Sequence, residues 1–268
     1  MTTLAPIIES MAPLTLVLAR MGGMVGSMPL VSGIAVPIRV RAMLALALSV
    51  VVFAASPARA SHMPDLDLLA YLPVMLGETL LGVCIGMIGG LPLAMLQLAG
   101  HLLGYQMGLS IAQTFNPAMD NQGDVASQIL FFLGITLYIS LGGLDALLLT
   151  LLQSYDHVPI GAFAVSHAPL GLFVDVLQSG FEVAISVAAP VMGVVTLLMV
   201  AMGFIMKTMP QINVLSVGFA IKMLAGLLML TLTIYVVADV ASEHIVEVVG
   251  RVGEWAGGLG APTSGGTW

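Results

Sequence analysis

Six apolar stretches, separated by more polar segments, make up most of this chain. They lie near residues 11–36, 42–56, 68–103, 129–152, 183–206 and 212–240. A helix needs about 20 apolar residues to cross a bilayer, so the second stretch is short and the third is long. Pro92 and the glycines around it are expected to break the third stretch into two pieces. The pattern predicts an all-α polytopic membrane protein of helical hairpins, with about six apolar helical runs and some broken or kinked helices.

The composition agrees with a membrane protein. Hydrophobic residues make up 59% of the chain and charged residues 8%, and the mean hydropathy is +1.09. A soluble domain of this size needs a far more polar surface. The net charge of −7 argues against a nucleic-acid partner, because nucleic acids select basic surfaces. The single cysteine, Cys84, excludes an intrachain disulfide.

Basic residues predict the orientation of the chain. Arg39 and Arg41 fall between the first two stretches and Lys207 falls between the last two, which is the same face if every stretch crosses once. The positive-inside rule makes this face cytoplasmic. Both termini are then expected on the outer side of the membrane.

Two charged residues interrupt the apolar stretches. Arg20 would cost about 3 kcal/mol or more inside a bilayer, so it is expected to face a partner or a cavity, or to snorkel to an interface. Glu78 is a candidate partner for Arg20. It is equally compatible with an acidic residue at a helix N-terminus, where the helix dipole favours negative charge. The sequence leaves both alternatives open.

Glycines recur every four residues in the third stretch. One ladder consists of Gly82, Gly86 and Gly90, and the second begins with Gly100 and Gly104. Helices in lipid associate by close packing, which small residues permit. A single ladder could serve packing inside the chain, whereas two ladders favour contacts with neighbouring subunits.

A mixed segment connects the third and fourth stretches. Residues 105–124 combine turn-forming Gly, Asn and Pro with apolar side chains, which is unusual for a loop in solvent. Such a segment fits a loop folded into protein or across an aqueous cavity. An ordinary re-entrant or interfacial loop is the alternative.

The polar segment between the last two stretches predicts the tip of a membrane hairpin. Pro210 is expected to end the preceding helix, and Gln211 and Asn213 can satisfy the freed backbone groups. Lys207 and Lys222 lie on either side of this turn. A short cytoplasmic loop is the simplest interpretation.

Catalytic chemistry is not indicated. Ser110 with His157 or His167 lacks the fuller motif of a serine hydrolase, and the histidines lack the His-x-x-x-His spacing of a metal site. We expect no enzyme activity, no cofactor and no metal. A multi-pass secondary transporter or channel for a small solute is the main alternative function, with Arg20, Glu78 and Asp145 along a substrate path.

The hairpin tip also resembles a family signature. The sequence Lys-x-x-Pro-Gln-x-Asn-Val from Lys207, followed by Gly218 and Lys222, resembles the FliR/SctT family of the bacterial type III protein export gate. Arg20, followed by Gly22-Gly23, resembles the opening pattern of that family. The chain departs from the family at Asp145, because a histidine is usual in that region.

The resemblance implies a structural, pore-forming subunit that conducts unfolded export substrates across the inner membrane. Residues 1–168 would resemble the FliP-type partner, residues 169–250 would form a FliQ-like hairpin, and residues 251–268 would be a flexible tail. Expected partners are FliP-type and FliQ-type subunits, the FlhB-type and FlhA-type gate proteins, and membrane lipid. Flagellar use is preferred to injectisome use, because residues 217–222 look closer to the flagellar version.

The resemblance also assigns roles to two sets of residues. A plug loop near residues 106–122 would close the channel, with the residues Gln106, Met107, Gly108, Leu109, Ser110, Phe115, Asn116 and Pro117. A cytoplasmic partner contact would use Lys207, Pro210, Gln211, Asn213, Gly218 and Lys222.

Overall fold

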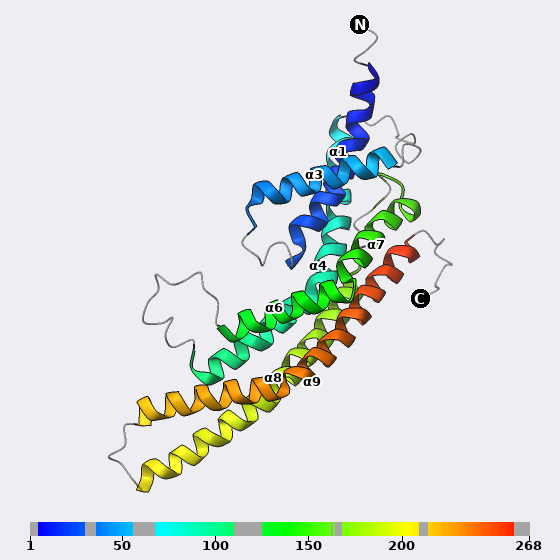
Figure 1. The fold of residues 1–268 in the computed structure, drawn as a ribbon. Helices are drawn as coiled ribbons and strands as arrows, with labels where there is room; N and C mark the ends of the chain where they lie inside the picture. Colours follow the sequence, from blue (N-terminus) through cyan, green and yellow to red (C-terminus); the bar gives the residue numbers. More distant parts are fainter. Residues whose placement is uncertain are drawn as a thin grey trace. The chain divides into compact units, whose positions relative to one another are not determined.

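The computed structural model describes residues 5–29, 36–55, 68–109, 125–161, 163, 168–208 and 214–259. These residues form helices and no strand, which confirms the predicted all-α fold (Figure 1). The helices are α1 (Ala5–Ser27), α3 (Ile38–Ala55), α4 (Leu68–Met107), α6 (Val125–Ser140), α7 (Gly143–His157), α8 (Leu170–Thr208) and α9 (Val214–Gly258).

The number of membrane-spanning helices is lower than the six expected. Within the described ranges, three helical segments are long and apolar enough to cross a bilayer: Tyr71–Met107, Leu170–Thr208 and Val217–Gly258. Helices α6 and α7 would add a fourth crossing if they form one broken span. The structure therefore supports a polytopic membrane protein with three or four spans among its described residues.

The breaks in the helices differ from those expected. Helix α4 continues through Pro92, so the prediction that this proline divides the third stretch is wrong. The fourth stretch is divided instead, where α6 ends at Ser140 and α7 begins at Gly143. Gly142 lies between them with φ of 72°, a left-handed conformation that glycine adopts without steric cost.

Helix α9 extends further than the sequence predicted. Residues 251–258, assigned to a flexible tail, form the last two turns of this helix. Val248, Val252 and Ala256 are buried along one face of it, and Arg251 forms an ion pair with Glu247 one turn away. Burial of an apolar face stabilises a helix end whose glycines would favour a coil in isolation.

The chain forms two compact units that interleave along the sequence. One unit contains residues 1–91, 142–176 and 247–268, and the other contains residues 92–141 and 177–246. These units cut across the boundary at residue 168. The boundary at residue 168 rests on the resemblance to the FliP-type and FliQ-type subunits, and it stays a prediction.

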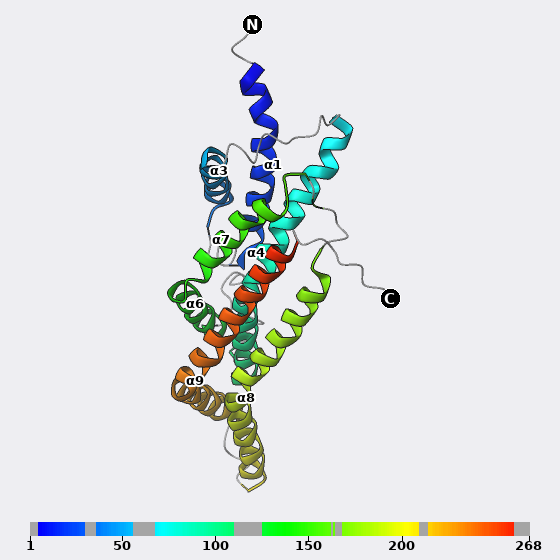
Figure 2. The same ribbon diagram turned by 90° about the vertical axis from the view of Figure 1, so that its right-hand side faces the viewer.

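In the first unit, α1 packs closely against α4 through the first glycine ladder (Figure 2). A Cβ atom on Gly82 would collide with the Arg20 backbone, and one on Gly90 would collide with Pro29. A Cβ atom on Gly86 would lie 2.5 Å from the Met24 carbonyl oxygen. The ladder formed by these glycines is therefore used for packing inside the chain.

In the second unit, α8 and α9 run side by side as a hairpin (Figures 1 and 2). The end of α4 and helix α6 pack on each other, with Gly100 of α4 against the Ser127 backbone of α6. Only 28% of the most apolar part of α8 and 17% of that of α9 is buried, compared with 72% for α4. Much of the hairpin surface is therefore available to lipid or to other subunits.

Candidate functional site

A buried ion pair joins α1 to α4 in the first unit. Arg20 Nε donates a hydrogen bond of 2.6 Å to Glu78 Oε2, and both side chains are completely buried. Glu78 lies ten residues after the start of α4, so the alternative that it is an N-terminal acid is wrong. The pairing supplies the charge compensation that an arginine in an apolar stretch requires.

Helix α7 supplies further partners for the guanidinium. Arg20 Nη1 donates to Ser154 Oγ at 3.1 Å, and Nη2 donates to the Val158 carbonyl at 3.3 Å. The guanidinium also lies over the ring of Tyr155, 4.2 Å from its centroid, in a cation–π contact. Arg20 thus connects three segments of the first unit: α1, α4 and the end of α7.

The second oxygen of the Glu78 carboxylate holds the turn that follows α7. Glu78 Oε1 accepts a hydrogen bond of 2.8 Å from the Gly161 backbone N–H. Gly161 has φ of 89°, which a residue with a side chain rarely adopts. Both oxygens of the carboxylate are therefore bonded, which is the condition under which a buried carboxylate is tolerated.

This cluster of Arg20, Glu78, Ser154, Tyr155 and Gly161 is suited to fixing a structure. Its two charges neutralise each other, and neither side chain is accessible to a solute. Among the residues that the structure describes, no group of three or more His, Cys, Asp or Glu side chains could hold a metal ion. The geometry supports a role in holding the first unit together.

Sequence reasoning did not find the partners that α7 contributes. Ser154, Tyr155 and Gly161 were not among the candidate site residues. Each lies more than 80 residues from the member of the ion pair that it contacts. Thr150 and Ser154 are polar residues on the buried face of α7, and a polar residue among apolar neighbours was the available clue.

The base of the predicted plug loop is anchored in the second unit. Gln106 Nε2 donates a hydrogen bond of 2.7 Å to Thr196 Oγ1 on α8. Met107 is fully buried, and its side chain packs against Gly226 of α9. A Cβ atom on Gly226 would lie 2.6 Å from Met107 Cγ. Helix α4 ends there, and Gly108 follows with φ of 84°. The Leu109 N–H donates a hydrogen bond to the Gly104 carbonyl, which satisfies one of the carbonyls in the last turn of α4.

The other predicted plug residues are not part of the described structure. Ser110, Phe115, Asn116 and Pro117 lie outside the described residues. The plug assignment therefore remains a prediction, and the structure describes only the helix end from which the loop departs.

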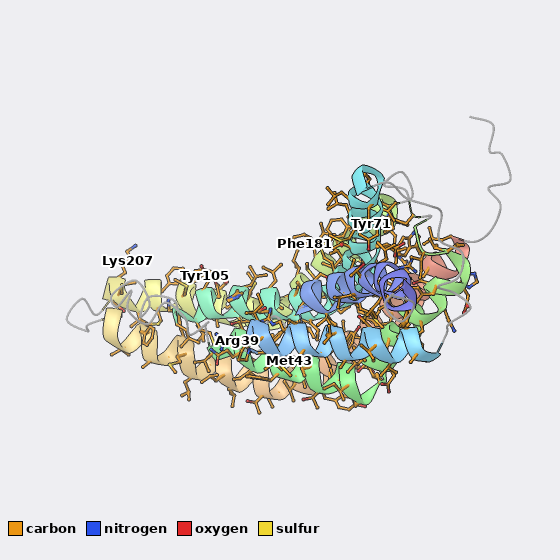
Figure 3. The ribbon with its side chains drawn as sticks, turned by 90° about the horizontal axis from the view of Figure 1, so that it is seen from above. Arg39, Met43, Tyr71, Tyr105, Phe181 and Lys207 are labelled. Atoms are coloured by element: carbon orange, nitrogen blue, oxygen red, sulfur yellow. The ribbon has the colours of Figure 1, made fainter. Side chains whose placement is uncertain are left out.

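The predicted partner contact is described in part. Lys207 is exposed in the last turn of α8, and its side chain points away from the hairpin (Figure 3). Gly218 is buried and Lys222 is half-buried on α9. Pro210, Gln211 and Asn213 lie outside the described residues. A cation at the end of a helix is favoured by the helix dipole, which accounts for Lys207 without a partner contact.

These features define an all-helical integral membrane protein with a buried structural ion pair and a long, exposed apolar hairpin. The sequence model of the family described as bacterial export proteins, family 1, matches residues 11–248, so the chain belongs to this family. This match confirms the FliR/SctT resemblance inferred from the hairpin signature.

Named relatives agree with the family match. The chain is 26% identical to the flagellar biosynthetic protein FliR of Caulobacter vibrioides, over 87% of this chain and 93% of that protein. It is 28% identical to FliR of Aquifex aeolicus, over 65% of this chain and 67% of that protein. It is also 27% identical to the Yop proteins translocation protein T of Yersinia pestis, over 70% and 74% of the two chains.

Proposed function

We propose that this protein is a structural, pore-forming subunit of the flagellar type III protein export gate, through which unfolded substrates leave the cytoplasm. The observation that carries the proposal is the family match over residues 11–248, together with a FliR relative aligned over 93% of its length. The exposed apolar surfaces of α8 and α9 support it, because a subunit of a membrane assembly needs such surfaces for its neighbours.

The transporter alternative is not favoured by the charged residues. It requires Arg20 and Glu78 to line a path for a solute, but both are completely buried and bonded to each other. Asp145, the third residue of that hypothesis, is exposed in the first turn of α7, where the helix dipole favours an acid. These three residues therefore do not form a common site for a solute.

The placement of charges supports an orientation in the inner membrane. Helix α8 has 39 residues and α9 has 45, so they are about 58 and 68 Å long, roughly twice the hydrocarbon thickness. The longest uncharged stretch of α8 is 183–206, which ends next to Lys207, and that of α9 is 223–238, which begins next to Lys222. We place these parts in the membrane, the lysines at the cytoplasmic face, and the acidic ends of the hairpin and both termini on the outer side.

The closure element is the segment near residues 106–122. Support comes from its turn-rich but apolar sequence and from the anchoring of its first residues, Gln106 and Met107, on α8 and α9. Functional loops are positioned by a rigid scaffold, and here the anchored end of α4 fixes the point from which the loop begins. The partners in the assembly are FliP-type and FliQ-type subunits, with the FlhB-type and FlhA-type proteins at the cytoplasmic face.

Detergent extraction followed by native mass spectrometry tests the function directly. We expect this chain to be recovered with several copies of FliP-type and FliQ-type subunits. A variant with Glu78→Gln, which breaks the ion pair, should give less of the complex at equal expression. Recovery of a monomer that carries a small solute would contradict the proposal and favour a transporter.

A further inference from the structure

One face of helix α9 in the second unit is exposed along much of its length. The exposed residues on this face, which we name the α9 stripe, are Leu228, Leu232, Tyr235, Asp239, Glu243 and Val246. We propose that the α9 stripe binds a membrane helix of a different subunit, one that is apolar along the first half of the stripe and carries lysine or arginine at the level of Asp239 and Glu243. This inference rests on the proposed membership of the export gate.

The α9 stripe is straight. Its residues follow each other at steps of three or four, and the five steps from Leu228 to Val246 average one helical turn. The stripe therefore runs parallel to the helix axis, over a length of about 27 Å. On the opposite side of α9, Leu230, Val237 and Ala241 are buried. One side of the helix packs within the chain, and the other is open to a partner of similar length.

The first half of the stripe is apolar. Leu228, Leu232 and Tyr235 are 60%, 68% and 81% exposed. They belong to the uncharged segment 223–238, which the proposed orientation places in the hydrocarbon. Lipid chains and a partner helix are both apolar, so this half of the stripe does not distinguish between them.

The second half of the stripe extends beyond the hydrocarbon. Asp239 and Glu243 are exposed, and neither carboxylate forms a hydrogen bond or an ion pair with another described residue. Val246 is 57% exposed on the same face. It lies eight residues, or about 12 Å, past the end of the uncharged segment. Lipid chains do not reach this level, whereas a partner helix continues past it.

The two carboxylates determine the charge of the partner. Asp239 and Glu243 are one turn apart on the same face, so both attract a cation placed between or beside them. An uncharged helix would remove the carboxylates from water without compensation, which is unfavourable. An anionic lipid headgroup would be repelled. A helix with lysine or arginine at this level provides complementary charge.

A symmetric pairing of two copies of this chain does not fit the stripe. Two α9 helices in the same orientation would place Asp239 and Glu243 beside the same carboxylates of the other copy, and like charges repel. The basic residues of α9 do not compensate them. Lys222 lies 17 residues, or about 25 Å, before Asp239, and Arg251 is paired with Glu247. The partner helix is therefore expected from a different subunit.

Site-specific photocrosslinking tests which molecule covers the stripe. The photoreactive amino acid p-benzoylphenylalanine replaces Leu228 or Leu232, one position at a time, and the assembled complex is irradiated in its membrane. At both positions we expect a crosslinked peptide from a different membrane subunit. A lysine or arginine should lie about two to three turns from the crosslinked residue of that subunit, towards the outer side. Crosslinks to lipid alone, to a second copy of this chain, or to a helix without such a cation would overturn the proposal.

A neutral variant separates the charge from folding. Asp239→Asn/Glu243→Gln adds no positive charge, so the orientation of the chain should be kept. In the detergent-solubilised complex, raising the salt from about 0.1 M to about 1 M should lower the crosslink yield of the parent about threefold, because salt screens exposed charges. The double variant should give the lower yield at both salt concentrations. A parent yield that does not depend on salt, or a double variant that behaves as the parent does, would contradict the charge complementarity.

Glu182→Gln is the matched control. Glu182 is an exposed acid of the neighbouring helix α8, and it accepts a hydrogen bond from Gln178 of its own helix. This variant should keep the yield and the salt dependence of the parent. Recovery of FliP-type and FliQ-type subunits is measured in the same samples. A complex that contains those subunits, but shows no crosslink from the stripe to any of them, would refute this inference and leave the proposed function intact.

Discussion

Arg20 and Glu78 are separated by 58 residues in the sequence, and their side chains form a 2.6 Å ion pair from which solvent is excluded. Three segments meet at this pair, because Ser154 and Val158 bind the guanidinium and Gly161 binds the carboxylate. The pair therefore determines how α1, α4 and the end of α7 fit together.

Removal of one charge should be more harmful than removal of both. Arg20→Met or Glu78→Gln leaves an uncompensated buried charge, which costs roughly 3–5 kcal/mol, whereas the loss of both can be close to neutral. A double-mutant cycle on complex recovery and thermal stability measures the coupling. Additive losses in the double variant would mean that the two residues do not act as a pair.

Neighbouring glycines on α1 should respond in opposite ways to the same substitution. Gly23→Ala places a methyl group against the Thr79 backbone, which cannot move aside easily, and should cost roughly 1–3 kcal/mol. Gly22→Ala meets no atom within 4 Å and should be tolerated. Thermal stability of the purified complex is the measurement. Similar losses for both variants would show that Gly22 is also packed in the assembly.

Deletion within the predicted plug should make the membrane permeable. If residues 109–116 help to close the channel, a complex without them should leak small ions or dyes, because the anchored end of α4 would remain while the loop beyond it is shortened. Dye release from vesicles that contain the complex is the measurement. A deletion of equal length, residues 261–268, serves as the control. Vesicles that stay as tight as those with the parent complex would rule out the plug assignment.

The helices were easier to predict than their ends and their contacts. An apolar stretch long enough to span a bilayer is predicted to be helical, because a helix satisfies all backbone hydrogen bonds within one segment. Pro92 did not end α4, since the helix around it is mostly buried and packing outweighs one lost hydrogen bond. The end of α9 was missed for a related reason: Val252 and Ala256 are buried, and that burial depends on the fold.

The candidate site shows the same division. The position of Arg20 in an apolar stretch predicted that its charge needs compensation, and Glu78 was the candidate for the opposite charge. Its other members could not be predicted, because Ser154, Tyr155 and Gly161 come close to the pair only after the chain has folded. The glycine ladder was informative about close packing, but not about which helix would fill it. Gly82 and Gly86 face α1 of the same chain.

The polar turn between α8 and α9 provides a test of a contact with other subunits. If the turn only sets the topology, the positive charges and Pro210 are sufficient, and Gln211→Ala and Asn213→Ala should have little effect. If the turn is buried against neighbouring gate proteins, each truncation leaves polar partners without a hydrogen bond. Such a loss costs roughly 1–3 kcal/mol, which should lower recovery of the complex about fivefold or more.

Export of a reporter substrate and recovery of the complex should be compared at equal membrane levels of each variant. Thr208→Ala is a suitable control, because its hydroxyl bonds to the Ile205 carbonyl within α8 and so has its partner inside the chain. We expect the two amide variants to fall well below this control, since an interface depends on hydrogen bonds that a topological signal does not use. If export and recovery of the complex in both amide variants equalled those of the parent protein, the segment would be only a hairpin loop with cationic ends. A loss in Asn213→Ala alone would confine the contact to the side of the turn nearest α9.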